Sequence, residues 1–238
     1  MGQRSGNGLS RLGQTRFLLD AKVKYPMIED IRALRPLEAI AMTFIQKLTF
    51  ADYLALEDSA REEKSELING ELIALPPEAW LNNDIAMFLF LQLVAIGVPF
   101  QRVKVHSCEL QTPVLEAGDA ANRYPDLVVV EPVHRANPDQ RMTITLEMPP
   151  LLWVMEVVSP GKTNRDRDYI RKRAQYAAVG IPEYVIVDPP EQAALVLRLE
   201  QGEYIEAGRY TGECPLQSPT FPALNLTAAQ ILSAGQDG

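Results

Sequence analysis

The chain has little that would place it in a membrane or outside the cell. Its 238 residues include only two cysteines, Cys108 and Cys214, which lie far apart and form no metal-ligand spacing. The longest apolar stretch, Ile85–Val98, follows Asp84 and contains Gln92, so it predicts a buried helix and not a bilayer span. No compact apolar signal segment begins the chain. We therefore expect a cytoplasmic protein with reduced thiols and no membrane partner.

Aromatic residues are also scarce, at 7%. Basic residues are fewer than acidic ones, with 23 Lys and Arg against 31 Asp and Glu. The net charge of −8 argues against a general nucleic-acid coat, because such proteins are usually basic. The segment from Lys162 to Arg173 is the exception, with six basic residues against Asp166 and Asp168. A local basic patch on an acidic protein can contact phosphates. The alternative is an ordinary solvated helix face.

What the chain has is enough apolar sequence, 47%, for one good core. Residues 1–46 begin with a stretch rich in Gly, Ser, Arg and Gln, so we expect an N-terminal extension there, poor in order. One domain over residues 47–233 and a short tail over 234–238 should follow. Strand-like segments alternate with a few helices, which predicts an α/β or α+β layer structure.

Local signals predict the order of the elements. Asn69-Gly70 is the dipeptide of a two-residue hairpin turn, so Ser65–Leu75 should form a hairpin. Helices are expected over about 78–96, over 164–179 with Gly180 as its end, and in short pieces after Thr49 and Thr227. Strands are expected over about 101–108, 110–114, 126–131, 151–158 and 183–187, with a final hairpin over 194–199 and 204–210.

Asp126 and Glu156 are the most informative residues, because each lies in an apolar, strand-like run. An ionised carboxylate there is costly unless it is paired or binds a metal. The two strands are consecutive, so antiparallel pairing is the simplest arrangement. If Glu131 lies opposite Leu151, then Asp126 lies opposite Glu156 on the same face, and oxygen ligands so placed suit Mg²⁺ or Mn²⁺. The alternative is that Asp126 is a turn residue after Pro125 and that Glu156 pairs with a lysine or arginine.

The helix after the second carboxylate carries Asp168, Lys172 and Tyr176 four residues apart, with Gln175 beside them. Ile170 and the alanines at 174, 177 and 178 predict an opposite, apolar face. One interpretation brings Lys172 beside the carboxylates, where an ammonium can hold an attacking water or offset phosphate charge. The other is a surface pair between Asp168 and Lys172, worth a few tenths of a kcal/mol.

Several other patterns are interpreted as carrying no chemistry. Gly161-Lys162-Thr163 lacks the earlier glycine of a phosphate-binding loop, so no nucleotide cofactor is expected. His106 and His134 have no partner spacing and are predicted to be packing or loop residues. Ser159 lies in no nucleophile-elbow pattern.

The motifs taken together resemble a known family. They are Tyr124-Pro125-Asp126-Leu127-Val128-Val129-Val130, Val154–Pro160, Arg167-Asp168, Lys172, Tyr176 and Gly180–Pro189. In order and spacing they resemble the Uma2 (Uma-two) family, bacterial endonuclease-like proteins of the PD-(D/E)XK superfamily, over about residues 47–233. The chain departs from the superfamily pattern because Val158, not lysine, stands two residues after the second acid.

The resemblance implies a restriction-endonuclease-like core, a mixed sheet flanked by helices, that holds Mg²⁺ or Mn²⁺ on Asp126, Glu156 and the carbonyl of Val157. It also implies that Lys172 has moved onto the helix. Glu66 is expected to face the site, and Asp168, Gln175 and Tyr176 are expected to be further supporting residues of it. Lys162, Arg165 and Arg171 are expected to contact phosphates.

The predicted activity is phosphodiester hydrolysis of DNA, as a monomer or as a homodimer, since many such nucleases act as dimers. A first alternative is an inactive nuclease fold that binds nucleic acid or a partner protein. A second, acid/base work on a sugar by Asp126 and Glu156, fits poorly with few aromatic residues.

Overall fold

The structure, a computed structural model, describes residues 47–56, 63–137 and 139–234. Its helices are α1 (Phe50–Ala55), α2 (Trp80–Ala95), η3 (Phe100–Arg102), η4 (Pro132–Arg135), α3 (Lys162–Asp166), η5 (Arg167–Lys172), α4 (Arg173–Val179) and α5 (Ala228–Ser233). Its strands are β1 (Ser65–Ile68), β2 (Glu71–Ala74), β3 (Val103–Val105), β4 (Glu109–Gln111), β5 (Asn122–Arg123), β6 (Leu127–Val129), β7 (Thr143–Ile144), β8 (Trp153–Val157), β9 (Glu183–Asp188), β10 (Ala193–Glu200) and β11 (Glu203–Thr211). The extension expected over residues 1–46 lies outside the described residues, as do residues 235–238 of the expected tail.

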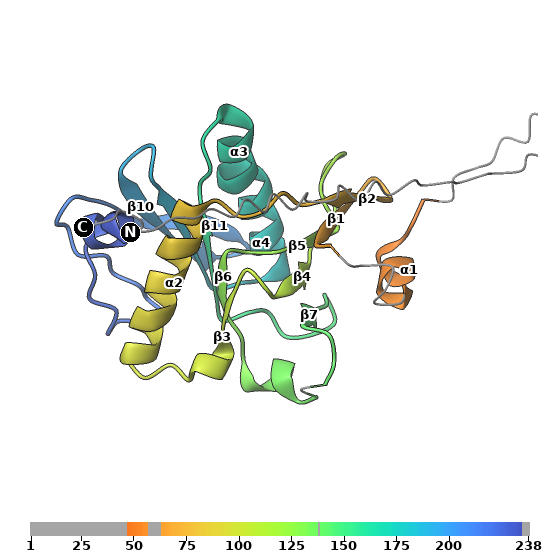
Figure 1. Ribbon diagram of the computed structural model, residues 1–238, viewed down its shortest axis with the longest axis horizontal. Coiled ribbons are helices and arrows are strands. Elements are labelled where there is room, and N and C mark those ends of the chain that lie inside the picture. Colours follow the sequence, from red (N-terminus) through yellow and green to blue (C-terminus); the bar gives the residue numbers. More distant parts are fainter. Residues whose placement is uncertain (1–46, 57–62, 138, 235–238) are drawn as a thin grey trace, which may run out of the picture. The chain divides into compact units, whose positions relative to one another are not determined.

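A mixed sheet of six strands forms the centre of the fold, in the order β11-β10-β9-β8-β6-β3 (Figure 1). β8 and β9 run parallel, because the chain between them crosses over through α3, η5 and α4. The other neighbours in this sheet pair antiparallel. Two smaller sheets, β1-β2 and β5-β4-β7, stand beside it. The predicted mixed sheet flanked by helices is confirmed.

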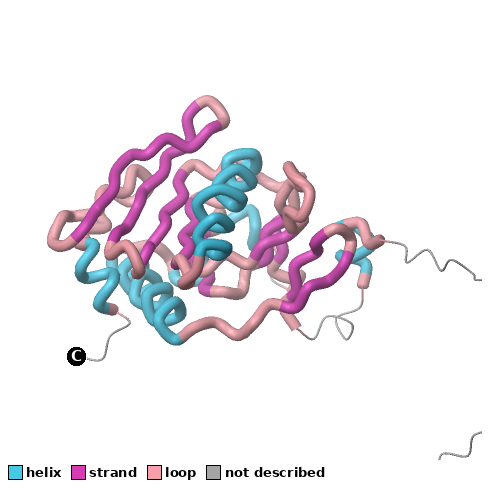
Figure 2. The backbone as a smooth tube through the Cα atoms, turned by 90° about the horizontal axis from the view of Figure 1, so that it is seen from above, coloured by secondary structure: helices cyan, strands magenta, loops and turns pink. Residues whose placement is uncertain are grey.

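Alternation of side chains along the strands divides the core into two layers. Leu127, Val129 and Met155 face the layer that also holds α2 and α5. Val128, Val154 and Ile186 face the opposite layer, which holds Tyr176 of α4. Figure 2 shows helices on both sides of the main sheet. Asp126 and Glu156 lie two residues from Val128 and Val154, so their side chains belong to the layer beneath η5 and α4.

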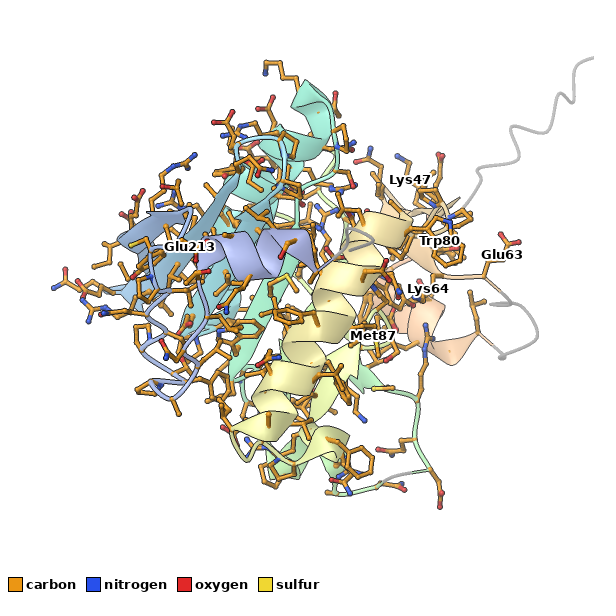
Figure 3. The ribbon with its side chains drawn as sticks, turned by 60° about the vertical axis from the view of Figure 1, so that its left-hand side comes forward. Lys47, Glu63, Lys64, Trp80, Met87 and Glu213 are labelled. Atoms are coloured by element: carbon orange, nitrogen blue, oxygen red, sulfur yellow. The ribbon has the colours of Figure 1, made fainter. Side chains whose placement is uncertain are left out.

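Helix α2 was predicted to be buried, and this is wrong for one of its faces. Ile85, Leu89 and Leu93 are buried against the sheet, but Trp80 is 86% exposed and Met87 also faces outward (Figure 3). The helix is apolar around most of its circumference, so periodicity in the sequence does not show which side the sheet covers. None of the described helices is long and apolar enough to cross a membrane.

The predicted turns are confirmed. Asn69 and Gly70 both have positive φ, 52° and 81°, as a two-residue hairpin turn between β1 and β2 requires. Thr49 and Thr227 form capping boxes at α1 and α5. The expected strand over 110–114 is shorter than predicted, and β4 joins the three-stranded sheet instead of the main one.

The helix predicted over 164–179 is present but not continuous. Its middle turn, η5, is π-helical and separates α3 from α4. A π-helical turn changes the spacing at which side chains share a face and is frequent at functional sites. This turn carries Asp168 and Lys172.

Candidate active site

Asp126 and Glu156 face one another across adjacent strands, as predicted. Leu127 pairs with Met155 and Val128 with Val154, so the residue before β6 falls opposite Glu156. The carboxylate of Asp126 extends toward β8, where its Oδ2 accepts a hydrogen bond of 2.6 Å from the backbone amide of Val157. Both carboxylates are buried. The antiparallel register is therefore confirmed, while the metal-binding roles of the two residues remain predictions.

His106 lies beside Asp126 on the side away from Glu156, because β6 lies between β3 and β8 in the sheet. Val105 pairs with Leu127, and the backbone amide of His106 donates to the Asp126 carbonyl at 2.9 Å. In the side chains, Nδ1 of His106 lies 3.4 Å from Oδ1 of Asp126 and 3.8 Å from Oε1 of Glu78. One ligand atom from each of these three residues falls within 4.8 Å of the others. The sequence analysis gave neither His106 nor Glu78 a role in the site.

Glu156 has partners on both of its oxygens. Lys172 Nζ lies 2.8 Å from Oε2, and the hydroxyl of Tyr176 donates to Oε1 at 2.6 Å. Burial raises the pKa of the Glu156 carboxyl above its ordinary value, opposed by the ammonium of Lys172. Burial alone would lower the pKa of Lys172, but the carboxylates of Glu156 and Asp168 outweigh it and raise that pKa. The helix therefore holds a charged lysine against the second acid, as the resemblance implied.

The buried face of the helix is its polar one. Asp168, Lys172, Gln175 and Tyr176 are buried, whereas Ile170 is 60% exposed. The apolar face predicted opposite Asp168, Lys172 and Tyr176 is thus the exposed one, and the interpretation that turns Lys172 toward the carboxylates agrees with the structure. Hydrogen bonds and ion pairs satisfy the buried polar groups. Tyr184, for example, donates to the Asp168 carbonyl at 3.0 Å from strand β9.

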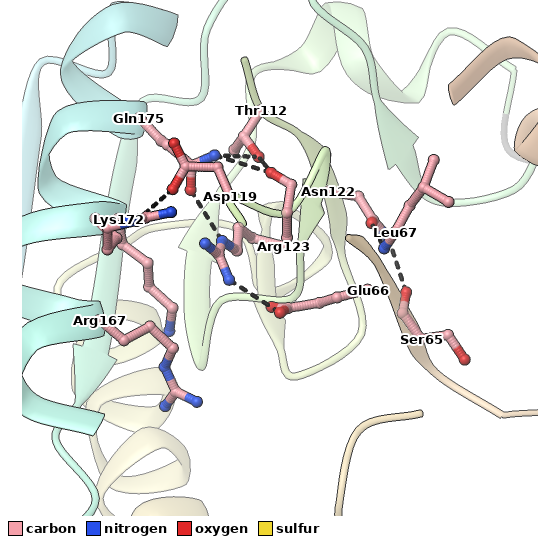
Figure 4. Close-up of polar contacts among 12 residues, drawn as sticks. Ser65, Glu66, Leu67, Thr112, Asp119, Asn122, Arg123, Arg167, Lys172 and Gln175 are labelled. Atoms are coloured by element: carbon pink, nitrogen blue, oxygen red, sulfur yellow. Dashed lines mark hydrogen bonds and ion pairs between the residues drawn. The ribbon is translucent and has the colours of Figure 1, made fainter. Parts of the chain in front are cut away.

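Glu66 reaches the site through a chain of polar contacts (Figure 4). Its Oε2 lies 2.9 Å from Nη1 of Arg123, and Nε of Arg123 donates to Gln175 at 3.0 Å. The amide of Gln175 in turn donates to the carbonyls of Pro113 and Ala120 at 2.7 and 2.8 Å. These contacts hold β1, β5 and α4 together around one wall of the site.

A cavity of about 190 Å³ opens onto these groups. The residues around it that carry charge are Glu66, Glu78, Asp126, Glu156, Arg167 and Lys172. Arg167 is a third residue, after His106 and Glu78, that was not assigned to the site from the sequence. A larger cavity of about 750 Å³ lies over β10, β11 and residues 215–225, but none of the predicted site residues lines it. The predicted site residues Asp126, Glu156 and Lys172 all line the smaller cavity.

The three residues expected to contact phosphates have partners within the chain. Arg165 pairs with Asp188 and stacks on Tyr169, and Arg171 lies 2.5 Å from Asp119. Lys162 is exposed and pairs with Asp166 one turn away. Lys162 thus projects into solvent, whereas Arg165 joins α3 to the end of β9 and Arg171 joins η5 to the loop that carries Asp119.

His134, predicted to be a packing or loop residue, lies in the short 3-10 helix η4 and helps to cap it. Its Nδ1 accepts from the Glu131 amide at 2.9 Å, and its Nε2 lies 2.7 Å from the Pro149 carbonyl. The position of His106 beside Asp126 was harder to predict from the sequence. Its position opposite Asp126 follows only when β3 is known to pair with β6, and β4 and β5 lie between these strands in the sequence.

Two of three comparisons with known proteins found a similar family or structure. A family model described as "Uma2: Putative restriction endonuclease" matches residues 50–229. The crystal structure of "a putative nuclease belonging to DUF820" from Anabaena variabilis ATCC 29413 is similar with a TM-score of 0.55 and 19% identity. That likeness covers 79% of this chain and 99% of the other, and at such identity it supports the fold. No match was found among curated proteins.

Proposed function

The chain belongs to the Uma2 family, and from this premise we propose that it is a metal-dependent endonuclease that hydrolyses phosphodiester bonds of DNA. We propose Mg²⁺ or Mn²⁺ as its cofactor and the cytoplasm as its location. The single observation that carries the proposal is the opposition of Asp126 and Glu156 on adjacent strands, with Lys172 held 2.8 Å from Glu156. Two carboxylates on one buried face require a cation or a proton between them.

The residues present fit a divalent cation. Asp126 uses Oδ2 to accept the Val157 amide, and its Oδ1, 3.4 Å from Nδ1 of His106, accepts no hydrogen bond from the described residues. Each oxygen of Glu156 accepts one contact, and a carboxylate has about four lone-pair sites in total. The carbonyl of Val157 accepts a long bond of 3.4 Å from Asn82. When bound, the cation supplies a Lewis acid and lowers the pKa of a coordinated water.

Lys172 is the proposed positioning and charge-compensating group. Glu156 and Asp168 hold its ammonium from two sides, at 2.8 and 2.9 Å, so it has a fixed direction when substrate arrives. A fixed donor costs no reorganisation as charge develops on the phosphate. The ammonium would orient the attacking water or bind a phosphate oxygen.

Arg167 is the best-placed second cation, since it lines the same cavity. Burial acts to lower its pKa, but Asp168, Glu156 and Glu66 raise it overall, so the guanidinium stays charged. We propose that Arg167 and the exposed Lys162 contact phosphates beside the scissile bond. Arg165 and Arg171 would join them only by exchanging a carboxylate partner for a phosphate.

The test is a cleavage assay of the full chain on supercoiled, single-stranded and branched DNA, with Mg²⁺, Mn²⁺ or EDTA. Asp126→Asn should abolish metal-dependent cleavage and leave the fold intact. Asp139→Asn makes the same chemical change at an exposed residue and should cut like the wild type. Equal cutting by the wild type and Asp126→Asn would refute the assignment.

One observation favours a second function, a nuclease fold that binds nucleic acid without cutting it. Lys172 and Tyr176 already satisfy both oxygens of Glu156 without a metal. Calorimetry with Mn²⁺ separates the two functions, because a module that only binds nucleic acid has no need of a cation at Asp126.

A further inference from the structure

His106 is a buried side chain with no hydrogen bond. Its side chain is 10% exposed, and neither Nδ1 nor Nε2 has a hydrogen-bond partner among the described residues. A neutral imidazole offers one donor and one acceptor, and buried polar groups are normally satisfied. Its Nδ1 lies 3.4 Å from a carboxylate oxygen of Asp126 and 3.8 Å from one of Glu78. This ring is therefore directed at two acidic side chains without bonding to either.

The backbone fixes His106 in this position from both sides. Its amide donates to the Asp126 carbonyl at 2.9 Å, and its carbonyl accepts from the ammonium of Lys64. Its φ of 50° ends β3 at this residue. Asp126 is anchored too, through the Val157 amide. Two of the three donor groups thus stand on the rigid main sheet, and Glu78 comes from the segment just before α2.

The spacing of the donor atoms suits a single ion. Ligands held about 2.1 Å from one cation lie about 3 Å apart when adjacent and about 4.2 Å apart when opposite. The three atoms of Glu78, His106 and Asp126 lie within 4.8 Å of one another, so small side-chain rotations bring them to these distances. Glu78 is partly exposed and free to make most of this adjustment.

The ammonium of Lys172 beside Glu156 also favours an ion site on the His106 side of Asp126. The ammonium of Lys172 lies 2.8 Å from Glu156, and a cation placed there would meet a like charge. On the opposite side of Asp126, the carboxylates of Asp126 and Glu78 face the His106 ring, and the ammonium of Lys64, which also lies there, binds the His106 carbonyl and not the ring. A divalent ion is thus held most favourably between Asp126 and His106.

We propose that His106, with Asp126 and Glu78, binds a first-row transition-metal ion such as Mn²⁺ or Co²⁺ in preference to Mg²⁺. The inference rests on Asp126 as the metal-binding carboxylate of the proposed function, and it places the ion on the His106 side of Asp126 and not between Asp126 and Glu156. Imidazole suits transition metals, whereas Mg²⁺ prefers oxygen ligands throughout. The site therefore selects its metal through one side chain outside the predicted carboxylate pair.

The first test is pulsed electron paramagnetic resonance of Mn²⁺ bound to tag-free full chain. The chain contains two histidines, so in His134→Ala a histidine nitrogen at the metal can come only from His106. Modulation from ¹⁴N that changes on labelling with ¹⁵N-histidine supports the inference in wild type and in His134→Ala. Bound Mn²⁺ without any histidine modulation overturns it, and this readout requires no variant of His106.

The second test is calorimetry with Co²⁺, Mn²⁺ and Mg²⁺ alone. His106→Gln should weaken Co²⁺ and Mn²⁺ binding by roughly tenfold or more, since even the outer partners of metal ligands change affinity on that order. His134→Gln should leave all three affinities unchanged. If Asp126→Asn abolishes binding and His106→Gln does not, this inference fails and the proposed carboxylate site stands. If neither variant changes binding, both fail.

Discussion

Lys172 Nζ lies 2.8 Å from Glu156 Oε2, although the lysine belongs to the helix that follows the strand and not to the strand itself. Two residues after Glu156, where the superfamily pattern has its lysine, Val158 is buried in the apolar layer. The crossover to β9 returns the helix over this layer, so the ammonium reaches the acid from above the sheet. In this chain, then, the lysine beside the second acid comes from the helix and not from the strand.

The pair should be costly to break. Lys172→Met keeps the length of the side chain but leaves Glu156 without its cation and Asp168 with only Arg167 beside it. Breaking a buried ion pair by removing one partner typically costs about 3–5 kcal/mol. Urea unfolding followed by circular dichroism should show a loss of this order. Adding Glu156→Gln should recover part of it, and no loss in the single variant would contradict the ion pair.

The helix buries its polar face and exposes Ile170, which gives a second prediction. Ile170→Lys should change the free energy of unfolding by less than about 0.5 kcal/mol, because this side chain is exposed. Gln175→Leu should cost roughly 1–3 kcal/mol for each buried group that it leaves unpaired, among them Arg123 Nε. Thermal and urea unfolding of both variants measures this. A larger loss for Ile170→Lys than for Gln175→Leu would show that the apolar face is the buried one.

The cysteines should differ in reactivity. Burial raises the pKa of the Cys108 thiol to about 12, whereas Cys214 is exposed. A thiol reagent at pH 8 should therefore label one cysteine in the native protein and two in urea, and Cys214→Ser should abolish the native reaction. The raised pKa means that the folded state keeps a proton which the unfolded state loses above its ordinary value of 9.0. Stability from this group should fall as the pH rises from about 9 toward 12.

Metal binding should also stabilise the fold. At a concentration 100 times its dissociation constant, a ligand that binds only the folded state adds about 2.7 kcal/mol. Mn²⁺ should therefore raise the melting temperature of the wild type, and EDTA should reverse the shift. Asp126→Asn should melt at the same temperature with and without Mn²⁺, and Asp139→Asn should respond like the wild type. An equal shift in all three proteins would place the bound ion elsewhere.

The carboxylate pair was within reach of the sequence because it depends on local information. β6 and β8 neighbour one another in the main sheet, both are apolar and buried, only the short β7 lies between them in the chain, and one assumed register brought Asp126 opposite Glu156. The hairpin at Asn69-Gly70 was predictable for a similar reason, since its turn chemistry lies in two adjacent residues.

The rest of the site depends on partners distant in sequence. The polar face of the helix is buried because Arg123, Thr112 and Tyr184 meet it there, and helical periodicity contains no record of such partners. His106 lies beside Asp126 only because β3 pairs with β6. In the sequence, two strands of another sheet, β4 and β5, separate β3 from β6. Glu78 belongs to a connecting segment with no pattern of its own.

The most direct measurement is anomalous diffraction at the manganese edge from crystals grown with Mn²⁺. The account predicts a peak about 2.0–2.2 Å from a carboxylate oxygen of Asp126, with a His106 nitrogen and Glu78 completing its ligands. A peak between Asp126 and Glu156 would keep the nuclease site and remove the role of His106. A crystal with Mn²⁺ at saturating concentration and no peak at Asp126 would contradict the account as a whole.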